Sequence, residues 1–179
     1  MNDLIKSRRS VRKFKDEIIE DIILEKIIDK ARYSPSWGNS QCVRYHFIQN
    51  KKLIDEIENH AVLDFVYNKK ILSKAQQIVI VTYVNGKSGK LEKYNIESNN
   101  PNKWEIFDTG IACQTFCLAA WEENIGTVIM GVIDDEKIKE IIKLNDEEHV
   151  GAIIVYGRPE EIPEAPKRLP ISNLMNIIK

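Results

Sequence analysis

Three arginines and two serines crowd the first dozen residues of the chain, in the run Ser7, Arg8, Arg9, Ser10, Val11, Arg12. A guanidinium group is planar and can bind two phosphate oxygens at once, and positive charges held this close repel one another unless an anion lies between them. The run therefore has the chemistry of a phosphate site. A solvated basic patch is the alternative that the run by itself leaves open.

A second polar segment follows at residues 34–41, with the sequence Ser-Pro-Ser-Trp-Gly-Asn-Ser-Gln. Its proline and glycine predict a sharp turn, and its hydroxyls and side-chain amides can hydrogen-bond a polar heterocycle or a polyol. An ordinary loop that ends a helix would have the same composition. The motifs G-x-G-x-x-G and G-x-x-x-x-G-K-[ST] are absent, so side chains must contribute more to any phosphate binding.

The other residues with catalytic or metal-binding side chains are too widely spaced to suggest a site. The three histidines do not fall at metal-ligand intervals, and the three cysteines include no CxxC pair. Cys113 and Cys117 lie four apart in an apolar helical run, so we expect them in the core. No metal site is predicted, and the histidines are expected to be structural.

Helices must position the two polar segments. Apolar residues at four-residue steps predict an amphipathic helix over residues 20–33, between the segments. Residues 51–59 return to helical spacing, and Asp134 to Glu136 open a further helix whose positive end favours carboxylates. Residues 105–124 are nearly all apolar in their middle, as expected of a central helix that is buried all round or lies at a subunit interface.

Strands alternate with these helices. The β-branched run from Gln77 to Val84 predicts an internal strand buried on both faces. Residues 85–103 lack periodicity and are expected to form a long exposed loop. Four prolines after Gly157 exclude a continuous helix and imply an extended tail over residues 159–179. The other three predicted strands span residues 44–49, 127–133 and 150–156.

Composition limits the classes of protein that fit. A chain of 179 residues that is 43% hydrophobic can form a single domain with a core, which we assign to residues 1–179. The net charge of −1 and the interleaved acidic and basic residues argue against a nucleic-acid partner. No apolar run has the length of a signal peptide or a membrane span, so a soluble, cytoplasmic protein with no membrane partner is expected.

The order of the motifs resembles the FMN-dependent nitroreductase family. An Arg-Arg-Ser-x-Arg element precedes an amphipathic helix and a Ser-Pro-Ser-x-x-Asn-x-Gln turn. A later helix contains the motif Asp-x-Gly-x-x-x-Gln, whose first residue is Asp108. With Lys167, Arg168, Leu169 and Pro170, the resemblance covers residues 4–170. It implies an α+β fold, with a mixed β-sheet flanked by helices and a long central helix. It also implies a homodimer in which residues 159–179 pack on the partner subunit.

The resemblance also implies roles for individual residues in a flavin site shared by two subunits. Arg12 occupies the place of a basic residue near the flavin N1 and C2 carbonyl, where a cation stabilises the negative charge of the reduced ring. Asn68 and Lys70 lie near further contacts of the family, but their register is ambiguous by one residue. The other positions that match the family's flavin contacts fall into three groups. The phosphate and ribityl end is assigned to Arg8, Arg9, Ser10, Lys167 and Arg168; the turn from the partner subunit to Pro35, Ser36, Trp37 and Asn39; and the contact with flavin N5 to Met130 and Gly131.

The activity implied by the resemblance is ping-pong hydride transfer from NAD(P)H, through FMN, to a small electron-poor acceptor such as a nitroaromatic or a quinone. No protein nucleophile or general base is required. One alternative is a non-enzymatic flavin-binding or flavin-storage protein in which Trp37 blocks the flavin. Another is a structural interaction module whose arginines are merely solvated.

Overall fold

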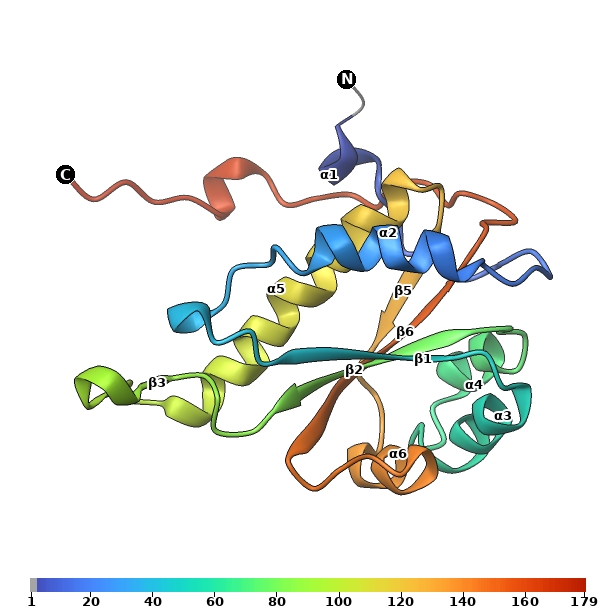
Figure 1. Ribbon diagram of the computed structural model, residues 1–179. Coiled ribbons are helices and arrows are strands. Elements are labelled where there is room, and N and C mark those ends of the chain that lie inside the picture. Colours follow the sequence, from blue (N-terminus) through green and yellow to red (C-terminus); the bar gives the residue numbers. More distant parts are fainter. Residues whose placement is uncertain (1–2) are drawn as a thin grey trace.

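A four-stranded antiparallel sheet forms the centre of the computed structural model, which describes residues 3–179 without the side chains at positions 92, 101 and 102 (Figure 1). The order across the sheet is β1-β2-β6-β5. All four predicted strands are confirmed, with shifted ends. They are β1 (Val43–Ile48), β2 (Ile78–Val84), β5 (Gly126–Met130) and β6 (Glu148–Gly157).

Strand β2 shows why the sheet is covered on both faces. Its residues alternate between two clusters of buried side chains: Val79 and Val81 pack in one, and Ile78 and Ile80 pack in the other. All four side chains have no exposed surface. The β-branched run therefore forms an internal strand, as predicted.

Helices supply the two outer layers (Figure 1). One face of the sheet carries α2 (Asp21–Ala31) and α5 (Pro101–Glu122), whose Ile27 and Phe116 are fully buried. The opposite face carries α3 (Lys51–His60), α4 (Val66–Leu72) and α6 (Asp135–Ile142). The α+β class with a long helix against the sheet is as expected. None of the helices in the described residues combines the length and apolarity that a membrane-spanning segment requires.

Helix α5 is longer than predicted and is not buried all round. It begins at Pro101, a residue type favoured in the first helical turn because its missing N–H would have no helical partner there. Cys113 and Cys117 are 3% and 2% exposed, so their predicted place in the core is confirmed. Ile106 and Phe107, however, are 53% and 59% exposed. Of the two expected environments, complete burial is therefore wrong.

The predicted loop at residues 85–103 is wrong in part. It contains a small hairpin of β3 (Lys90–Leu91) and β4 (Ile96–Glu97), joined through the 3-10 turn η2 (Glu92–Tyr94). Two-residue strands are too short to produce a detectable alternation of side chains, which is why the sequence pattern missed them. An ion pair of 3.2 Å between Lys90 Nζ and Glu97 Oε1 spans the hairpin.

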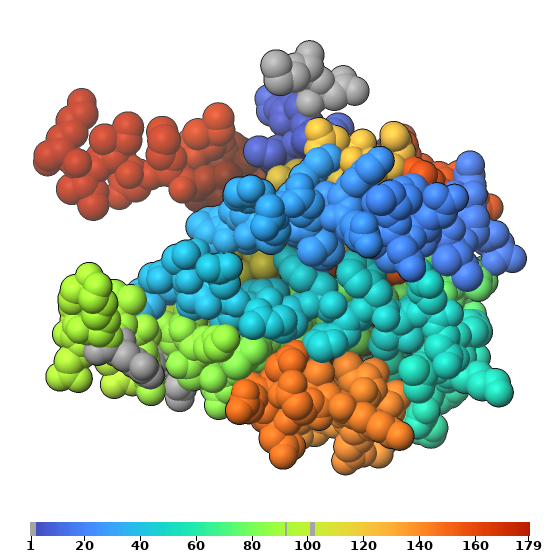
Figure 2. Space-filling model, viewed as in Figure 1, coloured from blue at the N-terminus to red at the C-terminus, as the bar shows by residue number. Residues whose placement is uncertain are grey.

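The N-terminal segment runs beside the sheet, whereas the C-terminal tail leaves it. After α1 (Leu4–Ser7), Ser10 forms a parallel bridge to Thr127, which adds a parallel contact to the antiparallel sheet. The tail after Gly157 is extended apart from the 3-10 turn η3 (Ile171–Asn173), and it projects from the body (Figures 1 and 2). Its apolar side chains are exposed, including Leu169, Ile171, Leu174, Met175, Ile177 and Ile178.

Candidate functional site

A cavity of about 560 Å³ opens along strand β5. The strand and the residues after it form one wall, from Val128 to Val132. Helix α4 and the residue before it contribute Phe65, Tyr67, Asn68 and Lys70, and the N-terminal segment contributes Arg12. Three predicted site residues therefore line one cavity. They are Arg12 and, more than a hundred positions later in the sequence, Met130 and Gly131.

The N-terminal segment reaches this cavity because it is fixed against β5. The Val11 N–H donates to the Thr127 carbonyl oxygen at 2.9 Å, and the Val11 side chain is fully buried. A Cβ at Gly126 would lie 2.6 Å from Val11 Cγ2, so only glycine permits the two segments to approach this closely. Arg12 follows with its Nη1 donating to the Ser10 carbonyl oxygen at 3.2 Å.

The backbone after β5 is open toward solvent at Gly131. A Cβ placed there would have no other atom within 4 Å, whereas Met130 before it is 3% exposed. A buried anchor followed by a bare glycine backbone leaves room for a flat ligand to contact main-chain groups. The open position is therefore a property that a flavin site requires.

Asn68 and Lys70 also line the cavity, although neither belonged to the predicted set. The Asn68 side chain is 7% exposed, and its Nδ2 donates to the Val132 carbonyl oxygen at 3.0 Å. This bond ties α4 to the segment that follows β5. The sequence signal was a polar residue within a seven-residue helix, which is too short for its periodicity to fix the register.

The other N-terminal candidates have different environments. Arg9 turns back on α1, where its Nη1 donates to the carbonyl oxygens of Lys6, Ser7 and Arg8 at 2.7, 3.1 and 2.9 Å. Arg8 Nε is buried and has no hydrogen-bond partner in the described residues. A buried donor without an acceptor is unfavourable, so Arg8 is suited to receive an anionic ligand. Lys167 and Arg168 are exposed on the tail, where no hydrogen bond or ion pair joins them to the described residues.

The turn residues lie elsewhere on the same chain. Pro35 and Ser36 line a second cavity of about 400 Å³, together with Tyr45 and the buried Asp108. The 3-10 turn η1 (Trp37–Asn39) follows, with Gly38 and Asn39 in the left-handed region at φ 56° and 57°. Within one subunit, therefore, the turn does not line the β5 cavity.

Asp108 holds this turn in place, a function that the motif alone did not reveal. Its carboxylate accepts hydrogen bonds from the Trp37 N–H at 3.0 and 3.2 Å, from Ser40 Oγ at 3.2 Å and from Ser88 Oγ at 2.7 Å. The indole of Trp37 lies 6.1 Å from that of Trp104 on α5, measured between ring centroids. The turn is thus anchored to α5 by a polar and an aromatic contact.

The cysteines do not supply a nucleophile. Burial raises the pKa of the Cys42 thiol, and burial with the neighbouring Cys117 raises the pKa of Cys113 to about 12. Burial also raises the pKa of Cys117, although a hydrogen bond with Thr127 opposes the shift. Thiols in this state are protonated at neutral pH and react poorly. No group of three or more potential metal ligands converges within residues 3–179.

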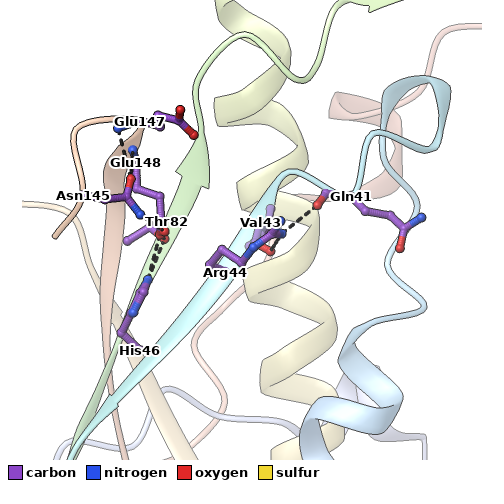
Figure 3. Close-up of polar contacts among 8 residues, drawn as sticks. All are labelled: Gln41, Val43, Arg44, His46, Thr82, Asn145, Glu147 and Glu148. Carbon is purple, nitrogen blue, oxygen red and sulfur yellow. Dashed lines mark hydrogen bonds and ion pairs between the residues drawn. The ribbon is translucent and has the colours of Figure 1, made fainter.

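His46 belongs to a polar cluster on β1, β2 and β6 (Figure 3). Its Nε2 lies 2.8 Å from Glu148 Oε2, and the same carboxylate accepts hydrogen bonds from Thr82 Oγ1 and from Asn145 Nδ2. Burial raises the pKa of Glu148, but the bonds from Thr82, His46 and Asn145 together outweigh it and leave the pKa below its ordinary value. His46 lies outside the β5 cavity.

Comparison with known proteins gives one consistent result. The model of the "Nitroreductase family" matches residues 5–158. The Bacillus subtilis (strain 168) protein YfhC, provisionally named an NAD(P)H nitroreductase, is 25% identical over 188 residues, covering 96% of this chain and 90% of its own.

Solved structures share the fold. A nitroreductase family protein from Clostridium difficile 630 superposes with a TM-score of 0.77 and 26% identity, over 97% of this chain and 95% of that one. A Desulfovibrio desulfuricans protein, provisionally named a nitroreductase and solved in complex with FMN, superposes with a TM-score of 0.80. Its identity is 23%, over 98% of this chain and 95% of that one.

Proposed function

Because the chain belongs to the nitroreductase family, we propose that it is an oxidoreductase that uses bound FMN to pass hydride from NAD(P)H to a small electron-poor acceptor. The observation that carries this proposal is the cavity along β5, where Arg12, Asn68 and Gly131 come together. A nitroaromatic or a quinone is the class of acceptor that we propose. When bound, FMN supplies the two-electron chemistry that no side chain of the cavity can perform.

The residues present fit the cofactor. Arg8 has a buried Nε without an acceptor, as a residue awaiting an anionic phosphate would have. The bare backbone at Gly131 and the apolar Val128 and Ile129 suit a flat ring, and the amide of Asn68 suits its polar edge. We propose that the phosphate and ribityl end is held by Arg8, Arg9, Ser10, Lys167 and Arg168, and the ring by Arg12, Asn68, Lys70, Met130 and Gly131.

Arg12 has an electrostatic role in this proposal. Its guanidinium is oriented by the bond to the Ser10 carbonyl, and it lines the cavity as a fixed positive charge. A fixed cation stabilises negative charge that develops nearby during a reaction, without having to reorganise. No general base is assigned, and an open cavity serves donor and acceptor in turn, as a ping-pong mechanism requires.

We further propose that the active form is a homodimer in which Pro35, Ser36, Trp37 and Asn39 approach the flavin of the partner subunit. Two exposed apolar regions support this. One comprises Ile106 and Phe107 on α5, and the other is the tail over residues 159–179, which we propose to pack on the partner. Side chains of this kind, clustered over adjacent positions, are typical of surfaces that a partner covers.

An absorbance spectrum tests the proposal directly. The purified chain, after incubation with FMN and removal of unbound flavin, is expected to be yellow and to lose its visible absorbance when NADH or NADPH is added without oxygen. A protein that stays colourless contradicts the proposal. A protein that binds FMN but is not bleached by either nicotinamide would be a flavin-storage protein instead.

A further inference from the structure

We propose that Asp108 is a positioning residue of the flavin site, which fixes the turn at residues 34–41 in the shape that contacts the flavin of the partner subunit. This inference rests on the proposed function and names the group that prepares one side of the site. Asp108 itself lines the second cavity, and only the turn that it holds is proposed to meet the flavin.

Several donors converge on the buried carboxylate of Asp108. Asp108 is 2% exposed, yet no ion pair to a lysine, arginine or histidine is formed by it in the described residues. Its charge is compensated by hydrogen bonds alone, from the Trp37 N–H, Ser40 Oγ and Ser88 Oγ, with a weaker contact from the Cys42 thiol at 3.8 Å. Burying a carboxylate is unfavourable unless such bonds replace its water, so these three donors are held to the position of the carboxylate.

The backbone of the turn adopts a conformation that is uncommon for residues with a side chain. Gly38, Asn39 and Gln41 have positive φ values of 56°, 57° and 49°. Residues with a side chain adopt this region at a cost, so a free segment of this sequence would spend most of its time in other shapes. The bonds from Trp37 and Ser40 to Asp108 flank Gly38 and Asn39 on both sides and thereby select the observed shape.

Asp108 also joins the turn to the segment that begins the β3–β4 hairpin, through Ser88. Ser88 is fully buried and bridges two carboxylates, because its N–H donates to Glu105 Oε1 at 3.2 Å and its Oγ to Asp108 Oδ2 at 2.7 Å. A Cβ at Gly38 would lie 2.9 Å from Leu91 Cδ2, so the turn and the hairpin also touch. The turn, the hairpin and the start of α5 therefore form one unit with Asp108 inside it.

The chemistry of the donors predicts how substitutions behave. Asp108→Asn keeps one oxygen for the Trp37 N–H, and its amide can donate to Ser40 Oγ and Ser88 Oγ because hydroxyls also accept. Asp108→Ala removes every acceptor. The Asn variant should therefore retain the turn to a large extent, and the Ala variant should lose it.

The experiment compares Asp108→Ala and Asp108→Asn with Glu148→Gln. Glu148 is a matched control, since it is 8% exposed and also accepts three hydrogen bonds, but it is linked to β1 and β2 rather than to the turn. Three readouts are used: the dissociation constant for FMN, the visible circular dichroism of bound FMN, and the near-ultraviolet circular dichroism of the FMN-free protein. The last reports the Trp37–Trp104 pair.

We expect Asp108→Ala to weaken FMN binding by about tenfold or more and to change both dichroism spectra, where tenfold corresponds to about 1.4 kcal/mol. The dissociation constant for FMN should stay within about threefold of the wild-type value in Asp108→Asn and within about twofold in Glu148→Gln, whatever the melting temperatures of the two variants. If Asp108→Ala does not fold, Ser40→Ala and Ser88→Ala each remove one donor, and smaller changes of the same kind are expected from them.

The inference is overturned if Asp108→Ala, or both serine variants, lose stability but keep the FMN affinity and both spectra of the wild type. It is also overturned if Glu148→Gln weakens FMN binding as much as Asp108→Ala does, because burial alone would then explain the effect. A wild-type chain that binds no FMN refutes the proposed function first. These results are distinguishable because the wild type is measured in the same series.

Discussion

The main-chain N–H of Lys15 donates to the carbonyl oxygen of Arg158 at 2.9 Å, so the segment before α2 lies beside the segment that follows β6. The pairing continues through the Glu160 N–H, which donates to the Lys13 carbonyl oxygen at 3.1 Å, and through an ion pair between Lys13 and Glu161 at 2.9 Å. The segment that carries Arg8 and Arg12 thus runs beside the beginning of the tail that carries Lys167 and Arg168.

We predict that Arg8→Ala combined with Arg168→Ala weakens FMN binding by about a hundredfold, since a hydrogen bond to a charged group contributes about 1.5–3 kcal/mol. The fold should persist, because Arg168 is exposed and Arg8 Nε forms no bond in the described residues. Fluorescence titration of FMN measures the affinity. Unchanged affinity would refute the phosphate assignment.

The control for this pair is Arg32→Ala. Arg32 is an exposed arginine whose Nε lies 2.9 Å from Asp29 Oδ1, and exposed ion pairs contribute little to stability. It removes one of the two positive charges that the double variant removes, at the residue that follows α2 and outside the β5 cavity. If it weakened FMN binding equally, the effect would belong to net charge rather than to the phosphate site.

Two glycines at opposite ends of β5, Gly126 and Gly131, should respond oppositely to substitution. Gly131→Leu places a side chain where the structure has open space, so we expect FMN binding to weaken at least about tenfold with the FMN-free stability within about 0.5 kcal/mol. Gly126→Ala forces a Cβ against Val11 and should destabilise the fold by about 1–3 kcal/mol. Urea unfolding measures the stability of both variants, and FMN titration measures their affinity. A Gly131→Leu protein that binds FMN normally would show that the flavin ring does not lie against Gly131.

Much of the fold could be predicted because its signals are local. The β-branched run of β2, the spacing of α2 and the carboxylates that open α6 each identify an element from adjacent residues. The β3–β4 hairpin was missed because its strands have two residues each. The start of α5 was missed because Pro101 ends many helices and begins others, and only the three-dimensional context decides which.

The candidate site could be predicted less completely, because its contacts join distant positions. The bond between Trp37 and Asp108 spans 71 residues, and no periodicity connects them. Asn68 reaches the cavity through a bond to Val132, 64 residues away, which sequence spacing does not encode. Arg12, Met130 and Gly131 were assigned through the resemblance to a family, and in the structure all three line the β5 cavity.

Acid should selectively remove one stabilising contribution, that of Glu148. Its pKa in the folded protein lies below the ordinary value of 4.5, so the ionised carboxylate stabilises the fold above that value. This stability is lost as pH falls through the lowered pKa. We expect Glu148→Gln to reduce the free energy of unfolding by about 1–3 kcal/mol at pH 7, and the difference from wild type to shrink below about pH 4.

Urea unfolding at pH 3 to 7 measures this dependence, with Glu164→Gln on the exposed tail as the control that should match wild type throughout. A difference between Glu148→Gln and wild type that stays constant with pH would mean that the carboxylate acts through its shape and not through its charge.

The reduction potential of bound FMN should depend on Arg12. In the proposed site its positive charge stabilises the reduced ring, so Arg12→Gln should lower the potential, on the order of 30 mV, equivalent to about 1.4 kcal/mol for two electrons. Arg12→Lys keeps the charge and should restore most of the difference. Lys13→Gln is the control, because Lys13 lines the same cavity but is paired with Glu161. Spectroelectrochemical titration measures all three, and a Gln variant with the potential of the wild type would remove Arg12 from the electrostatic role assigned to it.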